Sequence, residues 1–220
     1  VLGIVVERLA YKPLRSAPSL AVLITAIGVS YFLQNSALLI WKAAARVYPP
    51  VVEGSMQLFG GKLTVSYVSL LTIAACVVIM IGLTTFVNKS KMGKAMRACS
   101  EDKAAAQLMG INVNSTISFT FAVGSALAGI GAVLYCCSYP QATPTMGSML
   151  GLKAFVAAVL GGIGSIPGAM IGGIAIGLCE CFVSAIGLSA WKDAVTFAIL
   201  IVVLLVKPTG FLGRKVQEKV

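Results

Sequence analysis

Apolar residues are grouped along this chain into long blocks, separated by short polar segments. Five blocks are close to the length of about 20 residues that a helix needs to cross a bilayer. They are Ser19–Trp41, Val65–Val87, Thr116–Cys137, Gly168–Ile186 and Leu188–Val206. Because none alternates apolar and polar residues with a period of two, helices are favoured over a barrel. The pattern predicts an all-α, polytopic transmembrane helix bundle that forms a single domain over residues 1–220.

Two shorter apolar segments complete the pattern. Gly151–Ile163 is apolar but too short for a comfortable full crossing, and Val1–Val6 resembles the tail of another span. The first residue is not Met, and no signal peptide is recognisable. We therefore expect the sequence to be a fragment that lacks N-terminal helices.

Composition supports a membrane protein. Of 220 residues, 58% are hydrophobic and 11% are charged, and the mean hydropathy is +0.96. A soluble domain carries about a quarter charged residues. The chain has no histidine, which excludes histidine-based metal sites and proton relays. Its six cysteines form no C-x-x-C pair, so they are interpreted as small apolar side chains and no metal site is expected.

Basic residues gather in three segments, which hold 12 of the 17 lysines and arginines. These are Arg8, Lys12 and Arg15; Lys89, Lys91, Lys94, Arg97 and Lys103; and Lys207, Arg214, Lys215 and Lys219. The positive-inside rule predicts that all three are cytoplasmic. Residues 151–186 must then run from outside to inside and back, as a re-entrant or broken-helix pair. The net charge of +10 suits anionic lipid, and the aromatic residues do not interleave with the cations in the way that a surface for single-stranded nucleic acid would require.

A glycine-rich segment interrupts the apolar C-terminal half. Its helix-breaking residues are Gly161, Gly162, Gly164, Ser165, Pro167 and Gly168. Two interpretations are equally favoured. One is a helix break that lines a polar translocation pathway, as in many transporters. The other is a simple turn between two helices. Small residues every four positions beyond it predict close helix packing.

Glu180 is the one acidic residue deep inside a predicted span. A charged side chain at the bilayer centre costs about 2.5–3.5 kcal/mol, so Glu180 is expected to face the bundle interior and is a translocation candidate. The competing interpretation, slightly favoured, is a structural carboxylate that is hydrogen-bonded across helices. Trp191 and Lys192 are expected to anchor the chain at the membrane interface.

The charged segment over residues 88–115 predicts a short cytoplasmic helix. Ser100 is a plausible N-cap of a helix over residues 100–109, with Glu101 and Asp102 at its positive end and Gly110 as its stop. One side of this helix carries small apolar residues, namely Ala104, Ala105, Leu108 and Met109. A protein groove suits that side. A lipid surface is the alternative, although surface helices usually display larger apolar side chains.

These residues resemble a known family. Gly93-Lys-Ala-Met-Arg-Ala98, with Glu101-Asp102, Ala104-Ala105 and Leu108-Met-Gly-Ile111, is similar to the ATPase-contacting loop of bacterial branched-chain amino acid ABC-transporter permeases of the LivH type. Further similar stretches are Glu7–Arg15, Leu152–Gly168 and Lys207–Gly213.

The resemblance implies a role for the charged segment and a set of partners. The implied ATPase-coupling residues are Gly93, Arg97, Glu101, Asp102, Ala105, Leu108 and Gly110. The implied partners are two cytoplasmic ATPase subunits, a second related permease and an extracytoplasmic substrate-binding protein, in the inner membrane. The chain itself has no G-x-x-x-x-G-K-[ST] motif, so ATP is expected on the partner subunits and no cofactor on this one.

Other functions remain open at this point. The closest is an ABC permease for a monosaccharide, and another is an ion-coupled secondary transporter, although Glu180 alone supplies little intramembrane charge. An intramembrane enzyme is disfavoured, because no catalytic residues are recognisable: there are no paired carboxylates, no histidine and no serine paired with a base.

Overall fold

Five helices among the described residues are long and apolar enough to cross a membrane. The structure is a computed structural model that describes residues 1–15, 17–49, 54–58, 63–207 and 209–213. These residues fall into two compact units, Val1–Thr145 and Met146–Val220. Arg214, Lys215 and Lys219, which contribute to the predicted orientation, lie outside the described residues.

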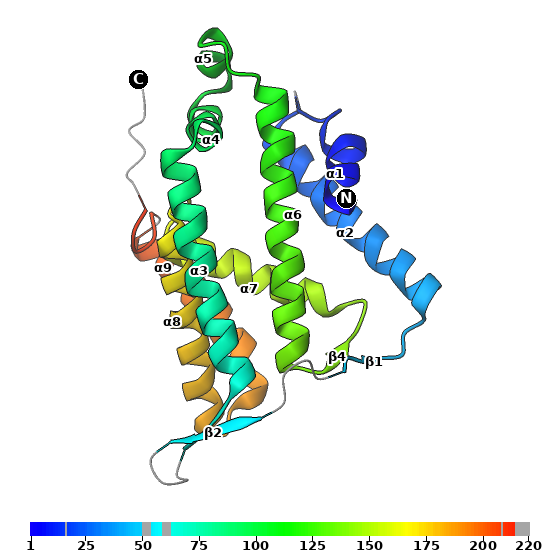
Figure 1. The fold of residues 1–220 in the computed structure, drawn as a ribbon, viewed down its shortest axis with the longest axis vertical. Helices are drawn as coiled ribbons and strands as arrows, with labels where there is room; N and C mark the ends of the chain where they lie inside the picture. The colour runs from blue at the N-terminus through cyan, green and yellow to red at the C-terminus, as the bar shows by residue number, and fades with distance from the viewer. Residues whose placement is uncertain (16, 50–53, 59–62, 208, 214–220) are drawn as a thin grey trace. The chain divides into compact units, whose positions relative to one another are not determined.

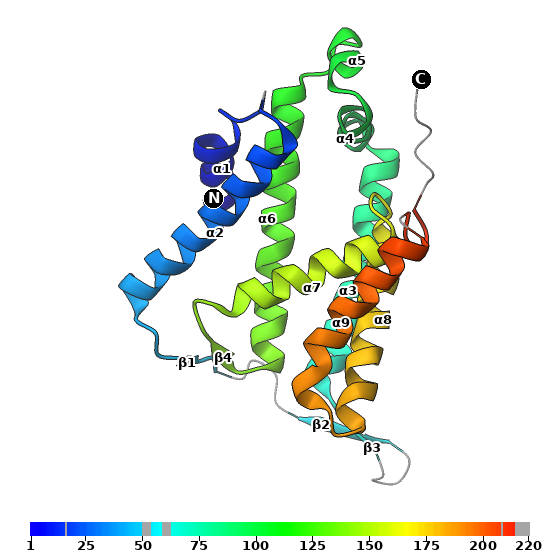
Figure 2. The ribbon, with the colours of Figure 1, turned by 180° about the vertical axis from the view of Figure 1, so that it is seen from behind.

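The first unit is helical, with two short antiparallel ribbons. Its elements are α1 (Leu2–Val6), the π-helix η1 (Glu7–Tyr11), α2 (Ser19–Trp41), β1 (Arg46–Val47), β2 (Ser55–Leu58), β3 (Leu63–Ser66), α3 (Tyr67–Lys89), α4 (Lys91–Glu101), α5 (Lys103–Leu108), α6 (Val113–Ser138) and β4 (Gln141–Ala142). β1 pairs with β4 and β2 with β3. Helices α3 and α6 run side by side, with α4 and α5 at one end and the ribbons at the other (Figures 1 and 2).

The second unit consists of α7 (Met146–Gly161), α8 (Ile166–Ala185), the short 3₁₀ helix η2 (Ser189–Trp191) and α9 (Lys192–Val206). Its core is formed by Val156, Leu160 and Ile176, against which side chains of α9 pack. Figure 2 shows α9 and α8 side by side, with α7 crossing them.

The predicted spans agree closely with these helices. α2 has the predicted bounds, and the other long helices begin or end within a few residues of the predicted ones. The start of α6 is set by Asn112, whose Oδ1 accepts the Ser115 N–H at 3.1 Å. The start of α3 is set by Ser66 in the same way, through the Val68 N–H at 3.3 Å. The all-α, polytopic fold is therefore confirmed.

Few apolar side chains of the long helices are buried within the chain. Ile24, Phe32 and Val78, for example, are about two-thirds exposed. A soluble protein would hide such residues, whereas a helix whose surface meets lipid or another membrane helix does not need to. The large apolar surface therefore belongs to a multi-pass membrane protein.

Candidate coupling segment and helix-break region

The charged segment between α3 and α6 folds into two short helices. Ser90 caps α4, because its Oγ accepts the Gly93 N–H at 2.9 Å. Asp102 caps α5, because its Oδ1 accepts the N–H groups of Ala104 at 2.8 Å and Ala105 at 3.1 Å. The predicted single helix over residues 100–109 is therefore wrong.

The predicted N-cap, Ser100, lies instead inside α4. Its hydroxyl donates to the Arg97 carbonyl at 2.7 Å, so it is not available to cap a following helix. Glu101 is the last residue of α4, and the backbone becomes extended at Asp102. An N-cap needs this extended conformation, and Asp is among the strongest N-cap residues, so α5 begins after Asp102.

Helix α4 packs against α3 and α6, and α5 packs against α4 and α6. Cys99 of α4, Ala106 of α5 and Val113 of α6 form one buried cluster. Gly93 is also buried, and a Cβ at this position would overlap the backbone of Val87 at the end of α3. Close contact of this kind makes the segment a fixed platform rather than a loose loop.

The outer side of α5 is apolar and exposed. Leu108 and Met109 are 88% and 82% exposed, and Ala104 and Ala105 are exposed beside them. Ala106, by contrast, is 3% exposed and faces the cluster.

The remaining residues of the predicted coupling set flank this surface. Arg97 donates to the Asn88 side chain, and Glu101 is exposed. Gly110 ends α5 with a φ of 77°, a conformation that favours glycine, so the predicted stop is confirmed.

The glycine-rich segment forms a tight turn between α7 and α8. Helix α7 ends at Gly161, and the Ser165 Oγ caps α8 by accepting the Gly168 N–H at 3.2 Å, with Pro167 in the first helical turn. Gly162 and Gly164 occupy the connecting turn with φ of 102° and 93°.

This turn brings two helices into backbone contact, because a Cβ on Gly161 would overlap the Gly168 carbonyl group. The interruption of the helix is thus confirmed, and its geometry is that of a helical hairpin. Its place along a translocation pathway stays a prediction.

A segment near the C-terminus covers this turn, which sequence reasoning missed. The Phe211 N–H donates to the Leu160 carbonyl at 2.9 Å, and the Leu212 N–H donates to the Gly161 carbonyl at 3.0 Å. These bonds satisfy carbonyls that the end of a helix leaves without partners. The feature of the sequence that could have indicated this contact is the pair of glycines Gly210 and Gly213. Both lie close to Gly162, and a side chain on Gly162 or Gly210 would overlap the backbone of the other segment.

Glu180 takes part in a polar cluster that joins three helices. One of its carboxylate oxygens accepts from the Lys153 Nζ of α7 at 2.8 Å and from the Thr196 Oγ1 of α9 at 3.1 Å. Lys153 also contacts the Asp193 carboxylate at 2.8 Å. The carboxylate therefore bonds across helices and has an ammonium partner. Lys153 was missed, although it is the one basic residue within the apolar α7.

Residues 1–204 match the family model for the permease component of branched-chain amino acid transport systems. The chain belongs to this family. The predicted family resemblance, drawn from the charged segment and the later signatures, is thereby confirmed.

Several curated relatives match this chain over nearly its whole length. The BraD permease protein of a high-affinity branched-chain amino acid transport system in Pseudomonas aeruginosa is 45% identical over 222 residues, which cover 99% of this chain and 72% of the relative. The corresponding LivH permease protein of Escherichia coli is 45% identical over 230 residues, which cover 98% of this chain and 71% of the relative. The ribose import permease protein RbsC of Haemophilus influenzae is 31% identical over 130 residues, or 56% of this chain. No solved structure matches.

Proposed function

We propose that this permease component is the membrane-spanning subunit of an ATP-binding-cassette importer that moves branched-chain amino acids across a bacterial inner membrane. The observation that carries this proposal is the 45% identity to BraD and LivH over nearly the entire chain. The match to the ribose permease is weaker and covers about half of the chain, so the comparisons favour an amino acid over a monosaccharide.

The proposed assembly contains two cytoplasmic ATPase subunits, a second related permease and an extracytoplasmic substrate-binding protein. The energy source must lie on another subunit, since the chain has no phosphate-binding loop. The exposed apolar side of α5, which includes Ala105 and Leu108, is proposed to dock in a groove of one ATPase. Gly93, Arg97, Glu101, Asp102 and Gly110 build and frame this docking surface.

In the proposed orientation, α4 and α5 face the cytoplasm and the ribbons face outward. The basic residues of α4 and α5 support this arrangement. Within the second unit, the turn over residues 162–165 lies against residues 209–213, which follow the last span. Both would then be cytoplasmic, as an out–in–out hairpin requires.

Transport is proposed to follow alternating access. ATP binding closes the ATPase pair, and the docked α4–α5 platform moves with it and tilts the membrane helices. Shifting an equilibrium from about 1:99 to 99:1 takes about 5.5 kcal/mol of differential interaction. The buried cluster of Cys99, Ala106 and Val113 supports this role, because it holds the platform to α6.

Reconstitution tests this function. The full-length protein, its partner permease, both ATPases and the binding protein are placed in proteoliposomes, and uptake of radiolabelled leucine is measured. We expect uptake that requires internal ATP, persists when a proton ionophore collapses ion gradients, and is competed by isoleucine and valine but not by ribose. Uptake that continues without ATPases, or stops with the ionophore, contradicts an ATP-driven importer. If ribose competes with leucine and isoleucine and valine do not, the proposal that the substrates are branched-chain amino acids is contradicted.

A further inference from the structure

The N-terminal segment formed by α1, η1 and the following turn packs along one face of α6. The α6 residues that it meets are Asn114, Ser118, Phe121 and Ser125, whose spacing of four, three and four places them on one side of the helix. A Cβ on Gly3 would overlap the Ser125 side chain, and the rings of Tyr11 and Phe121 lie 4.9 Å apart. The contact therefore extends over about three helical turns.

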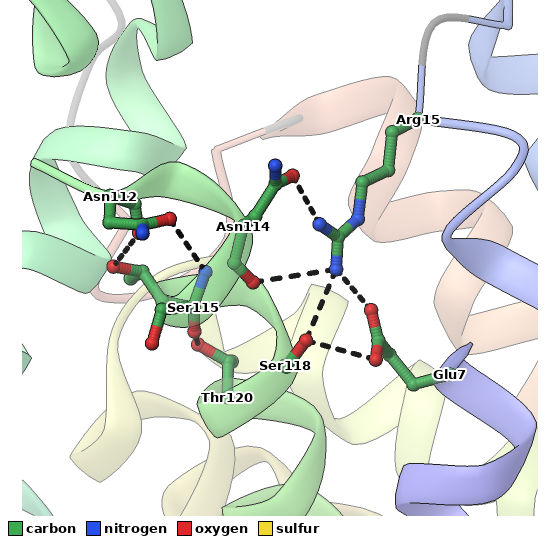
Figure 3. Close-up of polar contacts among 8 residues, drawn as sticks. Glu7, Arg15, Asn112, Asn114, Ser115, Ser118 and Thr120 are labelled. Atoms are coloured by element: carbon green, nitrogen blue, oxygen red, sulfur yellow. Dashed lines mark hydrogen bonds and ion pairs between the residues drawn. The ribbon is translucent and has the colours of Figure 1, made fainter.

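An ion pair with a buried carboxylate lies in the middle of this contact (Figure 3). Glu7 is 2% exposed and is paired with the Arg15 guanidinium. The second Glu7 oxygen accepts from the Ser118 Oγ at 2.9 Å. Arg15 also donates to the side chain and the carbonyl of Asn114 and, at 3.2 Å, to Ser118. The pair thus ties two parts of the N-terminal segment to the first two turns of α6.

The surroundings of this pair are largely apolar. A cavity of about 330 Å³ beside Arg15 is lined mainly by apolar side chains, among them Leu14, Val22, Ile117 and Phe121. In such a setting an ion pair with several hydrogen bonds holds a defined geometry, and loss of one partner leaves an uncompensated buried charge. Glu7 also begins the π-helical turn, whose Lys12 N–H donates to the Glu7 carbonyl at 2.9 Å, and such turns are frequent at functional sites.

The same end of α6 carries the α4–α5 platform. Val113 contributes to the buried cluster with Ala106 of α5, and the next residue, Asn114, accepts from Arg15. A continuous path of contacts therefore runs from α5 through the first turn of α6 to the Glu7–Arg15 pair. From there the chain leads within a few residues into the membrane helix α2.

We propose that Glu7 and Arg15 are positioning residues that transmit movement of the α4–α5 platform to α1 and to the membrane helix α2. This inference rests on the proposed function, since it assigns the pair a place in the same ATP-driven cycle. In the role proposed here, the pair acts through other residues and is assigned no contact with nucleotide or substrate. The ion pair makes the N-terminal segment and α6 move as one body. When ATP binding closes the ATPase pair and moves α5, the two elements that flank Arg15, η1 and α2, therefore tilt as well.

The test measures leucine uptake and ATP hydrolysis in the reconstituted full-length complex. Glu7→Gln and Arg15→Gln are compared with Lys12→Gln, which removes an exposed charge from the same segment. We expect each of the first two to lower uptake per ATP hydrolysed at least fivefold while hydrolysis stays within twofold. Glu7→Gln/Arg15→Gln should be no worse than either single variant, because the two residues act as one unit. Lys12→Gln should match the unmodified complex.

Several outcomes separate the possibilities. Unchanged uptake per ATP in both single variants, at equal amounts of protein, overturns the inference but leaves the proposed function intact. Failure of the unmodified complex to transport leucine overturns the proposed function itself. If the single variants do not accumulate, Ser118→Ala removes one hydrogen bond to Glu7 without stranding a charge. We expect it to lower the same ratio two- to threefold, and an unchanged ratio again overturns the inference.

A distance measurement gives a readout that a purely stabilising role would not move. Spin labels are placed at the exposed positions 12 and 107 of a full-length variant whose native cysteines are replaced. With the pair intact, the distance distribution between the labels should be the same with and without ATP. With Arg15→Gln it should shift or broaden when ATP binds. A distance distribution that stays narrow and does not change with ATP in Arg15→Gln contradicts the proposal that the Glu7–Arg15 pair holds the N-terminal segment to α6.

Discussion

Single residues decide where α4 ends and α5 begins within the α4–α5 platform. Asp102 accepts two backbone N–H groups at the start of α5, whereas Ser100 turns its hydroxyl back to the Arg97 carbonyl. Because α5 has only six residues, its own hydrogen bonds give little stability. The cap is therefore a large part of what keeps the docking side of α5 in place.

Replacing Asp102 tests this dependence. Asp102→Ala should destabilise α5 by about 1 kcal/mol, because it loses the cap. Leucine uptake per ATP hydrolysed should fall by about half or more in the reconstituted complex. Asp102→Ser is the matched control, since it removes the charge but retains a capping oxygen, and it should keep most of the coupling. Equal loss in both variants would show that the charge, and not the cap, is what matters.

Lys153 is the residue on which the polar cluster of the second unit depends. It lies 2.8 Å from both Glu180 and Asp193, on two other helices. Lys153→Met should leave Glu180 without its cationic partner. Removing one partner of a fully buried pair costs about 3–5 kcal/mol, and the cost here should be lower, since both side chains are about a quarter exposed.

The measurement is the thermal unfolding midpoint of the purified protein. Lys153→Met should lower it clearly, and Lys153→Met/Glu180→Gln should recover part of the loss because no unpaired Glu180 charge remains. Lys192→Met, which removes an exposed lysine next to Asp193 in the sequence, serves as the control. A midpoint for Lys153→Met equal to that of the control would contradict a stabilising role for the cluster.

At the scale of elements, the α7–α8 hairpin depends on contact between backbones. Gly161 and Gly168 leave no room for a side chain between the helices, and Gly172 is equally close to Ala157 of α7. The spacing of four among small residues predicted close packing, and the structure adds which helix is the partner.

Gly161→Ala should therefore destabilise the protein by about 1–3 kcal/mol, as an overpacked contact does. Gly177→Ala is a matched control on α8, because a Cβ there meets nothing within 4 Å and alanine favours a helix. We expect the unfolding midpoint to fall in the first variant and to stay or rise slightly in the second. The opposite order would mean that the hairpin does not need close contact at Gly161.

The positions of the long elements follow from the sequence more readily than the details between them. Apolar blocks of about the bilayer thickness predicted each long helix within a few residues. The division of the charged segment into α4 and α5 was not predicted, since Ser100 and Asp102 both suit an N-cap and only the backbone conformation separates them. The cap of α7 by residues 211 and 212 depends on a segment about 50 residues away.

At the scale of the whole molecule, the proposed orientation is open to direct labelling. Single cysteines at positions 42, 103 and 163 of a cysteine-free, full-length protein are exposed to a membrane-impermeant maleimide in cells and in inside-out vesicles. Each of these side chains is exposed. We expect label on position 42 from outside, and on positions 103 and 163 from the cytoplasmic side.

Position 163 is the decisive one, because it lies in the turn between α7 and α8. Label there from the cytoplasmic side supports a hairpin that enters from outside and crosses to the inner surface. Label from outside would contradict the out–in–out path, and label on position 103 from outside would contradict the cytoplasmic platform.

By itself, the sequence determined that this is an all-α, multi-pass membrane protein, where its long apolar helices lie, and to which family it belongs. These properties depend on local features, namely apolar length, capping residues and short motifs, which each segment carries without help from the others. Only the tertiary structure decided that Glu180 has a lysine partner and that Glu7 pairs with Arg15 against Asn114, 99 residues further along. A buried charge takes its partner from whichever helix packs beside it, and that choice is made by the path of the chain through space.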